Sequence, residues 1–330
     1  MTEQEIVTRN LVIAGAAWGE HYVDMLLNYC LPSMLPSIEA VTQKRKVLLS
    51  LHTDSIDRIN KSRVMMELIR LGIEARYYPV EDDINTGEKY SLLGKYQELG
   101  LNVARENHAD YHSLMPDHVY SCEFFTGMMA AVERGHLAIT RLCLSTSLEA
   151  MAADIQAYRI GAGISIDSAN LAAMAFKNIH PRSAVWEVKG ASYPNIHVTF
   201  FAIGNTLTMF SPHQSIVYLD RDEILPVHTT LPLDNELSKI MHQNLPIYCP
   251  QPHDRMGWVE VARVDNETCT DRARIKDFCE KYWIAAGIKH PKYLHMQTQD
   301  HMAMPVTGGV SKPRAELCKL ILALRESLHE

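Results

Sequence analysis

Several acidic and aromatic side chains stand directly after apolar runs of strand length. Parallel strands end at a common edge of a sheet, and open α/β sheets bind ligands at that edge. Carboxylates there can bind the hydroxyls of a ribose or a sugar, or hold a divalent cation beside a phosphate. The stretches are Trp18-Gly19-Glu20 after the run at 10–16, Asp54 after 46–52, Glu81 to Asp83 after 74–80, and Asp117 after 109–115.

The first of these turns does not match the dinucleotide-binding pattern. A Rossmann turn needs G-x-G-x-x-G so that the backbone can approach a pyrophosphate. Here Gly15 and Gly19 stand on either side of a segment that contains the bulky Trp18. AdoMet-dependent methyltransferases have a less strict glycine turn after the first strand and an acidic residue after the second. Asp54 stands at that second position, so the sequence is also compatible with a methyltransferase.

Each candidate also has a structural interpretation. Trp18 is a typical packing residue, and Glu20 in the first turn of a helix is favoured by the helix dipole. Asp54 is expected to be the N-cap of a helix that starts at Ser55. Asp117 at a strand end is a common turn residue. The sequence alone leaves both interpretations open.

Two histidines and an acidic turn are candidates for proton transfer. A histidine with a pKa near neutrality serves as a general base or as a metal ligand, which makes His213 and His180 candidates. Asp220 is a second candidate base, although its pairing with Asp222 is typical of a solvated turn. Lys89 is a candidate partner for phosphates.

Strand-length runs alternate with segments of helical period over the first 160 residues, which predicts a mostly parallel sheet flanked by helices. Helical faces are expected between the strands, and a further helix is expected over 166–178. The last 60 residues again show helical periodicity. The five predicted strands lie at 10–16, 46–52, 74–80, 109–115 and 136–144.

Composition narrows the class of protein. The chain has 330 residues, a net charge of −7 and 47% hydrophobic residues, which indicates a globular protein that does not bind nucleic acid. Its seven cysteines contain no C-x-x-C pair, so neither a disulfide framework nor a zinc ribbon is expected. With no signal peptide or transmembrane segment in the pattern, we expect a cytoplasmic protein, with homo-oligomerisation left open.

Several short motifs, in order, resemble a group of bacterial proteins with a GT-A-like glycosyltransferase fold. The resemblance covers about residues 10–225. The motifs are WGEHY and LPSML in the first helical segment, TDSIDRI after the second strand, KYSLLGKYQELGLNVARENHADY, PDHVYS at 116–121, HPRSAVW at 180–186, and Pro212-His213 before YLDRD.

The resemblance implies a GT-A-like domain over 1–225. It does not cover residues 226–330, which the helical periodicity near the C-terminus predicts to be a largely helical extension packed on that domain. It implies transfer of a sugar from a nucleotide-activated donor to a saccharide, lipid-linked or protein acceptor that approaches through 180–225. The donor would contact Trp18, Gly19, Glu20, Tyr22, Asp83, Lys89 and Asp117.

The family's D-x-D metal motif is only partly present. The corresponding position reads Met115-Pro116-Asp117, so Asp117 remains as a ligand for Mn²⁺ or Mg²⁺, together with His213, or as a direct ligand of ribose or sugar hydroxyls. Transfer with inversion of the sugar's anomeric configuration would need a general base, for which His213 and Asp220 are the candidates. Transfer with retention of that configuration is also compatible with the sequence. The other hypotheses are an AdoMet-dependent methyltransferase, a nucleotidyltransferase, or a non-catalytic carbohydrate-binding or assembly protein of the same fold.

Overall fold

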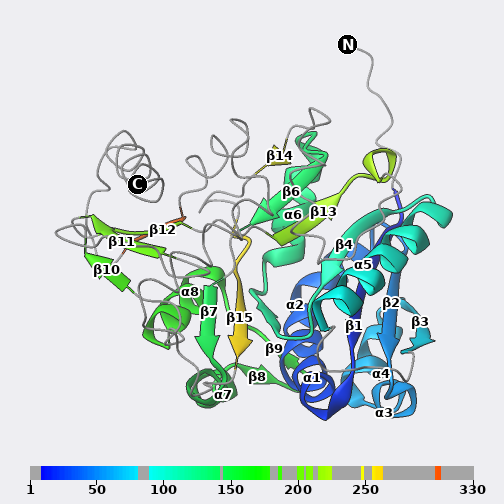
Figure 1. Ribbon diagram of the computed structural model, residues 1–330, viewed down its shortest axis with the longest axis horizontal. Helices are drawn as coiled ribbons and strands as arrows, with labels where there is room; N and C mark the ends of the chain where they lie inside the picture. Colours follow the sequence, from blue (N-terminus) through cyan, green and yellow to red (C-terminus); the bar gives the residue numbers. More distant parts are fainter. Residues whose placement is uncertain are drawn as a thin grey trace.

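The computed structural model describes residues 9–80, 89–141, 144–178, 185–187, 199–203, 206–210, 215–224, 247–248, 255–262 and 302–305. Within these residues a seven-stranded sheet has the order β14-β6-β13-β4-β1-β2-β3 (Figure 1). Its strands are β1 (Leu11–Ala17), β2 (Val47–Thr53), β3 (Glu74–Pro79), β4 (Asp110–Leu114), β6 (Ala138–Arg141), β13 (Ser215–Leu219) and β14 (Ile247–Tyr248).

The central sheet is mostly parallel. Strands β1, β2, β3 and β4 run in the same direction, whereas β13 is antiparallel to both β4 and β6. All residues of β1 and β2 are buried, as expected for parallel strands covered on both faces. The predicted mixed α/β fold with a mostly parallel sheet is therefore confirmed.

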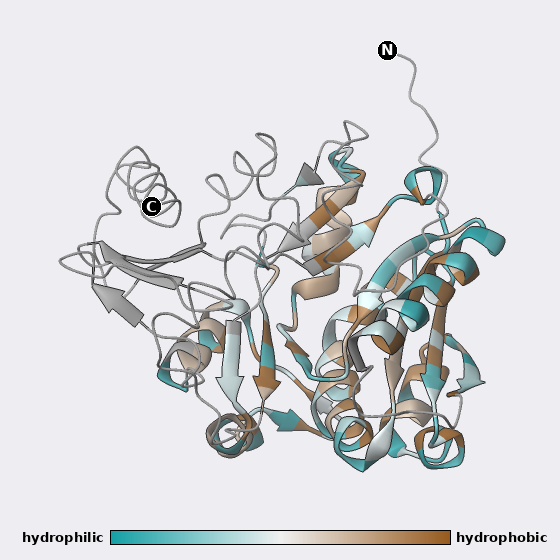
Figure 2. Ribbon diagram, in the orientation of Figure 1, coloured by the Kyte–Doolittle hydropathy of each residue, from teal (hydrophilic) through white to brown (hydrophobic). Residues whose placement is uncertain are grey.

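Helices cover both faces of this sheet. The helical elements are α1 (Gly19–Met25), the π-helical turn η1 (Leu26–Cys30), α2 (Leu31–Thr42), α3 (Ile56–Asn60), α4 (Arg63–Arg70), α5 (Lys89–Glu106), α6 (Phe124–Glu133), α7 (Leu148–Gln156), α8 (Ser168–Lys177) and the 3₁₀ turn η3 (Arg221–Glu223). Hydrophobic residues run through the strands, while the outer turns of α5 are hydrophilic (Figure 2).

The two faces of the sheet are packed differently. Alternate residues of β1 and β2, such as Ile13 and Leu49, form the main core with α2, α4 and α6. The other residues face α5, where a Cβ at Gly100 would lie 2.6 Å from the Cβ of Ala14. Glycine at this position therefore lets α5 lie close to β1, which sets the position of the α5 side chains relative to the strand ends.

A second sheet lies beside the end of β4. It is three-stranded in the order β5-β15-β7, with β5 (His118–Tyr120), β7 (Leu144–Ser147) and β15 (Trp258–Ala262). The remaining described strands are β8 (Arg159–Ile160), β9 (Gly163–Ile164), β10 (Val185–Glu187), β11 (Thr199–Ile203), β12 (Thr206–Phe210) and β16 (Met302–Pro305).

The expected boundary at residue 225 does not separate the hydrogen-bonded sheets. Strands β14, β15 and β16 come from beyond it and pair with β6, with β5 and β7, and with β12, respectively. The described residues of 226–330 that have regular structure are these strands, and the predicted C-terminal helices lie outside the described residues. In the described part of the chain, no helix is both long enough and apolar enough to cross a membrane.

Candidate functional site

The loops after β1 and β2 are tied together at the carboxyl edge of the sheet. Gly19 has a φ of +72°, a left-handed conformation that glycine adopts without strain. Its backbone N–H donates to Oδ2 of Asp54 at 2.8 Å, and Ser55 Oγ donates to Oδ1 of the same carboxylate at 2.9 Å. Asp54 therefore links two loops, and the expectation that it caps the next helix was wrong, because Ser55 is the N-cap of α3.

The remaining residues of the W-G-E-x-Y motif lie at the start of α1. Glu20 is exposed in its first turn. The Trp18 and Tyr22 rings lie with their centroids 6.5 Å apart, and Trp18 also lies 5.7 Å from Tyr96 of α5. Trp18 is partly buried against the cluster that contains Tyr96 and Val80, so it packs on α5 as well as standing at the carboxyl edge of the sheet.

An aromatic row extends from Trp18 across this edge, formed by Trp18, Tyr96, His52 and Tyr78. The His52 ring stacks on Tyr78 at 5.0 Å and on Tyr96 at 4.8 Å between centroids. Burial, together with the nearby charge of Lys95, lowers the pKa of His52 to about 4. The imidazole is therefore neutral at physiological pH. His52 stands inside a predicted strand, and its residue type alone gives no local signal of a site.

Asp117 lies in the turn between β4 and β5, also beyond a carboxyl end. Its backbone carbonyl accepts from the N–H of Val261 at 2.8 Å, which fixes the turn against β15. Burial, and then the charge of Asp117, raise the pKa of the Cys30 thiol at the end of η1. The carboxylate is thus close to the helical segment that begins at Gly19.

A polar row lies beside Asp117 on the three-stranded sheet, formed by His118, Glu260 and Ser145. Glu260 stands opposite His118 in the antiparallel pair and opposite Ser145 in the parallel pair. Ser145 Oγ donates to Glu260 Oε2 at 2.8 Å. These residues are far apart in the chain, and the only local signal was the apolar alternation around Glu260, which predicts a strand but not its neighbours.

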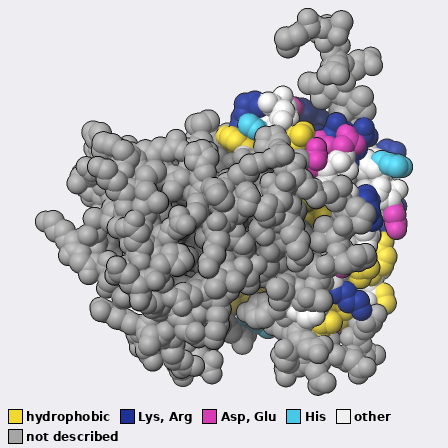
Figure 3. Space-filling view, turned by 45° about the horizontal axis from the view of Figure 1, so that its top comes forward, with side chains coloured by type: hydrophobic (Ala, Val, Ile, Leu, Met, Phe, Trp, Pro, Cys, Tyr) yellow, Lys and Arg dark blue, Asp and Glu magenta, His cyan; other side chains and the backbone are white. Residues whose placement is uncertain are grey.

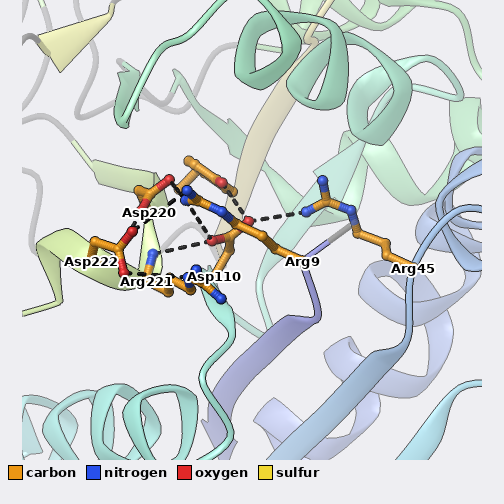
Figure 4. Close-up of polar contacts among 7 residues, drawn as sticks. Arg9, Arg45, Asp110, Asp220, Arg221 and Asp222 are labelled. Carbon is orange, nitrogen blue, oxygen red and sulfur yellow. Dashed lines mark hydrogen bonds and ion pairs between the residues drawn. The ribbon is translucent and has the colours of Figure 1, made fainter. Parts of the chain in front are cut away.

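Asp220 lies at the opposite, amino-terminal edge of the central sheet. It follows β13, which is antiparallel, and it pairs with Arg9, which precedes β1 (Figure 4). Asp117 lies beyond the other end of β4, whose five residues alone span roughly 16 Å. Asp220 is therefore not brought together with Asp117, because an antiparallel strand ends at the other edge of the sheet.

The amino-edge network around Asp220 is an ion-paired cluster. Asp110 accepts from Tyr218 Oη at 2.6 Å and from Arg45 at 3.1 Å, and Arg9 lies between Asp110 and Asp220 (Figure 4). Burial is the main cause that raises the pKa of Asp110, and it also raises the pKa of Tyr218. Figure 3 shows one face of the molecule, and in its described part Lys and Arg side chains lie next to Asp and Glu side chains.

Other predicted site residues fall outside the described part of the chain. These are His213, His180 and Asp83. Lys89 begins α5, but its side chain is also outside the description. Among the described residues, no three His, Cys, Asp or Glu side chains are grouped so that they could hold a metal ion. The predicted metal pair, Asp117 with His213, thus has one described member.

No family model matches the chain, and no curated protein matches it in sequence. Among solved structures, it is similar to a Bacillus anthracis protein assigned as a glucose-1-phosphate thymidylyltransferase and solved with sucrose. The TM-score is 0.38 with 6% identity, over 83% of this chain and 95% of that one. At these values the likeness carries no argument about activity.

Proposed function

We propose that this chain binds a nucleotide-activated sugar along the carboxyl edge of β1, β2 and β4 and transfers the sugar to an acceptor. The observation that carries the proposal is the parallel arrangement of these strands. It brings the Trp18-Gly19 turn, Asp54 and the Asp117 turn to one edge, where open α/β sheets bind ligands. The W-G-E-x-Y and P-D-x-V-x-S motifs of the resembled family fall on two of these turns.

Asp117 has the central role in the proposal. Its carboxylate binds sugar or ribose hydroxyls, or holds Mn²⁺ or Mg²⁺ together with His213 to neutralise the leaving diphosphate. The polar row beside it supplies the Glu260 carboxylate as an acceptor for sugar hydroxyls, and the Ser145 hydroxyl holds that carboxylate in place. His213 is the proposed base of an inverting reaction, and both stereochemical outcomes stay open.

A thermal-shift screen tests donor binding. The ligands are UDP-, GDP- and CDP-sugars with and without Mn²⁺, and AdoMet. A donor present at 100 times its Kd stabilises the folded state by about 2.7 kcal/mol, which raises Tm by several degrees. Asp117→Asn should abolish this rise. Asp57→Asn, which changes a highly exposed carboxylate on α3, is the matched control and should leave it unchanged.

The other hypotheses predict different ligands. Stabilisation by AdoMet alone would contradict sugar transfer and indicate a methyltransferase. Stabilisation by a nucleoside triphosphate, with turnover only when a sugar 1-phosphate is added, would indicate a nucleotidyltransferase. A shift with a free saccharide but with no nucleotide would indicate a non-catalytic carbohydrate-binding protein.

A further inference from the structure

His52 carries a buried side-chain nitrogen that forms no hydrogen bond with the described residues of the chain. The residue is 5% exposed, and its Nε2 has no hydrogen-bond partner among the described residues. Buried side-chain nitrogen and oxygen atoms nearly always have such a partner, because leaving one unpaired destabilises the folded state. An exception at the carboxyl edge of the sheet therefore needs an explanation.

The stacking around His52 restricts what can reach this nitrogen. Tyr78 lies at an interplanar angle of 23° and Tyr96 at 29°, so two tyrosine rings stack on the imidazole. The ring nitrogens form hydrogen bonds in the plane of the ring, so a partner of Nε2 must meet the ring at its edge. The neutral ring offers one donor and one acceptor nitrogen, which suits an uncharged hydrogen-bonding group better than a phosphate.

The position of His52 indicates where this partner would come from. His52 is the penultimate residue of β2 and pairs in register with Ala16 of β1 and Tyr78 of β3. It stands two residues before Asp54, which binds the Gly19 N–H. The unsatisfied nitrogen is therefore near the turn proposed to receive the donor, in a row of aromatic side chains.

We propose that His52 is a specificity-determining residue whose Nε2 forms a hydrogen bond with the edge of the donor's nucleobase, while the diphosphate and sugar lie toward Asp117. This inference rests on the proposed function. A nucleobase combines a flat apolar ring with in-plane donors and acceptors, which are the two properties that the aromatic row and the His52 edge can recognise.

Calorimetric titration of the full chain with UDP, GDP, CDP and inorganic pyrophosphate, in the presence of Mn²⁺, tests this inference. His52→Phe keeps an aromatic ring for stacking and removes the hydrogen bond. It should weaken the preferred nucleoside diphosphate about tenfold, as expected for one lost hydrogen bond, and leave pyrophosphate unchanged. Because an unsatisfied nitrogen is removed, the unliganded variant should be as stable as the wild type or more stable.

Ser50→Ala is the matched control. Ser50 lies on the same face of β2, two residues earlier in the strand. Its Oγ is also buried and has no hydrogen-bond partner within the described part of the chain. Its replacement should likewise keep or raise stability, and nucleotide affinity should not change. His52→Gln keeps hydrogen-bonding groups on a smaller side chain and should recover part of the affinity that His52→Phe loses.

A spectroscopic readout on the wild type does not depend on a variant that folds. In a long-range ¹H–¹⁵N spectrum, the His52 Nε2 resonance should shift when the preferred nucleoside diphosphate is added and should not shift with pyrophosphate. Equal nucleotide affinity in His52→Phe and wild type, with no Nε2 shift, overturns the inference and leaves donor binding intact; an internal water would then be the partner. A wild type that binds none of the nucleoside diphosphates overturns both proposals.

Discussion

The amino-edge network predicts that Asp110 is a residue of stability and not of catalysis. Its side chain is 0% exposed, and Arg45, which donates to it at 3.1 Å, is 10% exposed. Asp110→Ala removes this acceptor and leaves Arg45 and the Tyr218 hydroxyl without it. Removal of one partner of a buried pair costs about 3–5 kcal/mol. Asp222→Ala changes a carboxylate that is 64% exposed, and such surface pairs contribute about 0–1 kcal/mol.

Urea denaturation followed by circular dichroism measures this difference. With an m value of about 3 kcal/mol/M, Asp110→Ala should lower the midpoint by about 1 M or slightly more. Asp222→Ala should lower it by less than about 0.3 M. The rise in Tm caused by a bound donor should be the same in both variants, since the network lies at the edge opposite Asp117. Equal midpoints for the two variants would refute the assigned role of Asp110.

The pH dependence of this network has a defined sign. Burial raises the folded-state pKa of Asp110 above its usual value. The folded protein therefore binds this proton more readily than the unfolded chain does, and the linked contribution to stability is present at low pH and is lost as pH rises through the folded pKa. Protonation of Asp110 is thus not the cause of acid denaturation, and acidification should not reproduce the effect of Asp110→Ala.

Three further outcomes are expected. The pKa of His52 is lowered to about 4, so its linked contribution to stability is present above about pH 6.5 and is lost as pH falls toward 4. His52→Phe should therefore reduce the loss of stability between pH 7.5 and 4.5 by about 2–3 kcal/mol. An unchanged loss, measured by chemical denaturation at the two pH values, would contradict this. Gly19→Ala and Gly135→Ala should each lower stability by about 1–2 kcal/mol, because both residues have a positive φ and open space around a new Cβ. Only Gly19→Ala should weaken donor binding in a titration. Equal losses of binding in the two variants would count against the proposed site. Gly100→Ala should cost about 1–3 kcal/mol by overpacking α5 on Ala14, and an unchanged Tm would show that α5 adjusts freely.

The sequence alone predicted β1, β2, β3, β4 and the region of β6, but it did not predict β13 or β14 of the same sheet. The predicted strands at 10–16 and 46–52 correspond to Leu11–Ala17 and Val47–Thr53, and the predicted helix at 166–178 corresponds to Ser168–Lys177. Buried parallel strands and amphipathic helices leave strong local patterns, since each residue's polarity reports the face on which it lies. The common edge of Trp18, Asp54 and Asp117 followed from the same parallel pattern.

The tertiary structure decided which polar residues meet. Glu260 joins His118 and Ser145 only because β15 inserts between β5 and β7, and Asp220 lies at the far edge only because β13 runs antiparallel. Neither strand order nor strand direction leaves a local pattern in the residues concerned. The same holds for His52, whose buried and unsatisfied Nε2 depends on how Tyr78 of β3 and Tyr96 of α5 close over it. Periodicity determined the faces of the elements, whereas contacts between distant segments determined the chemistry of the site.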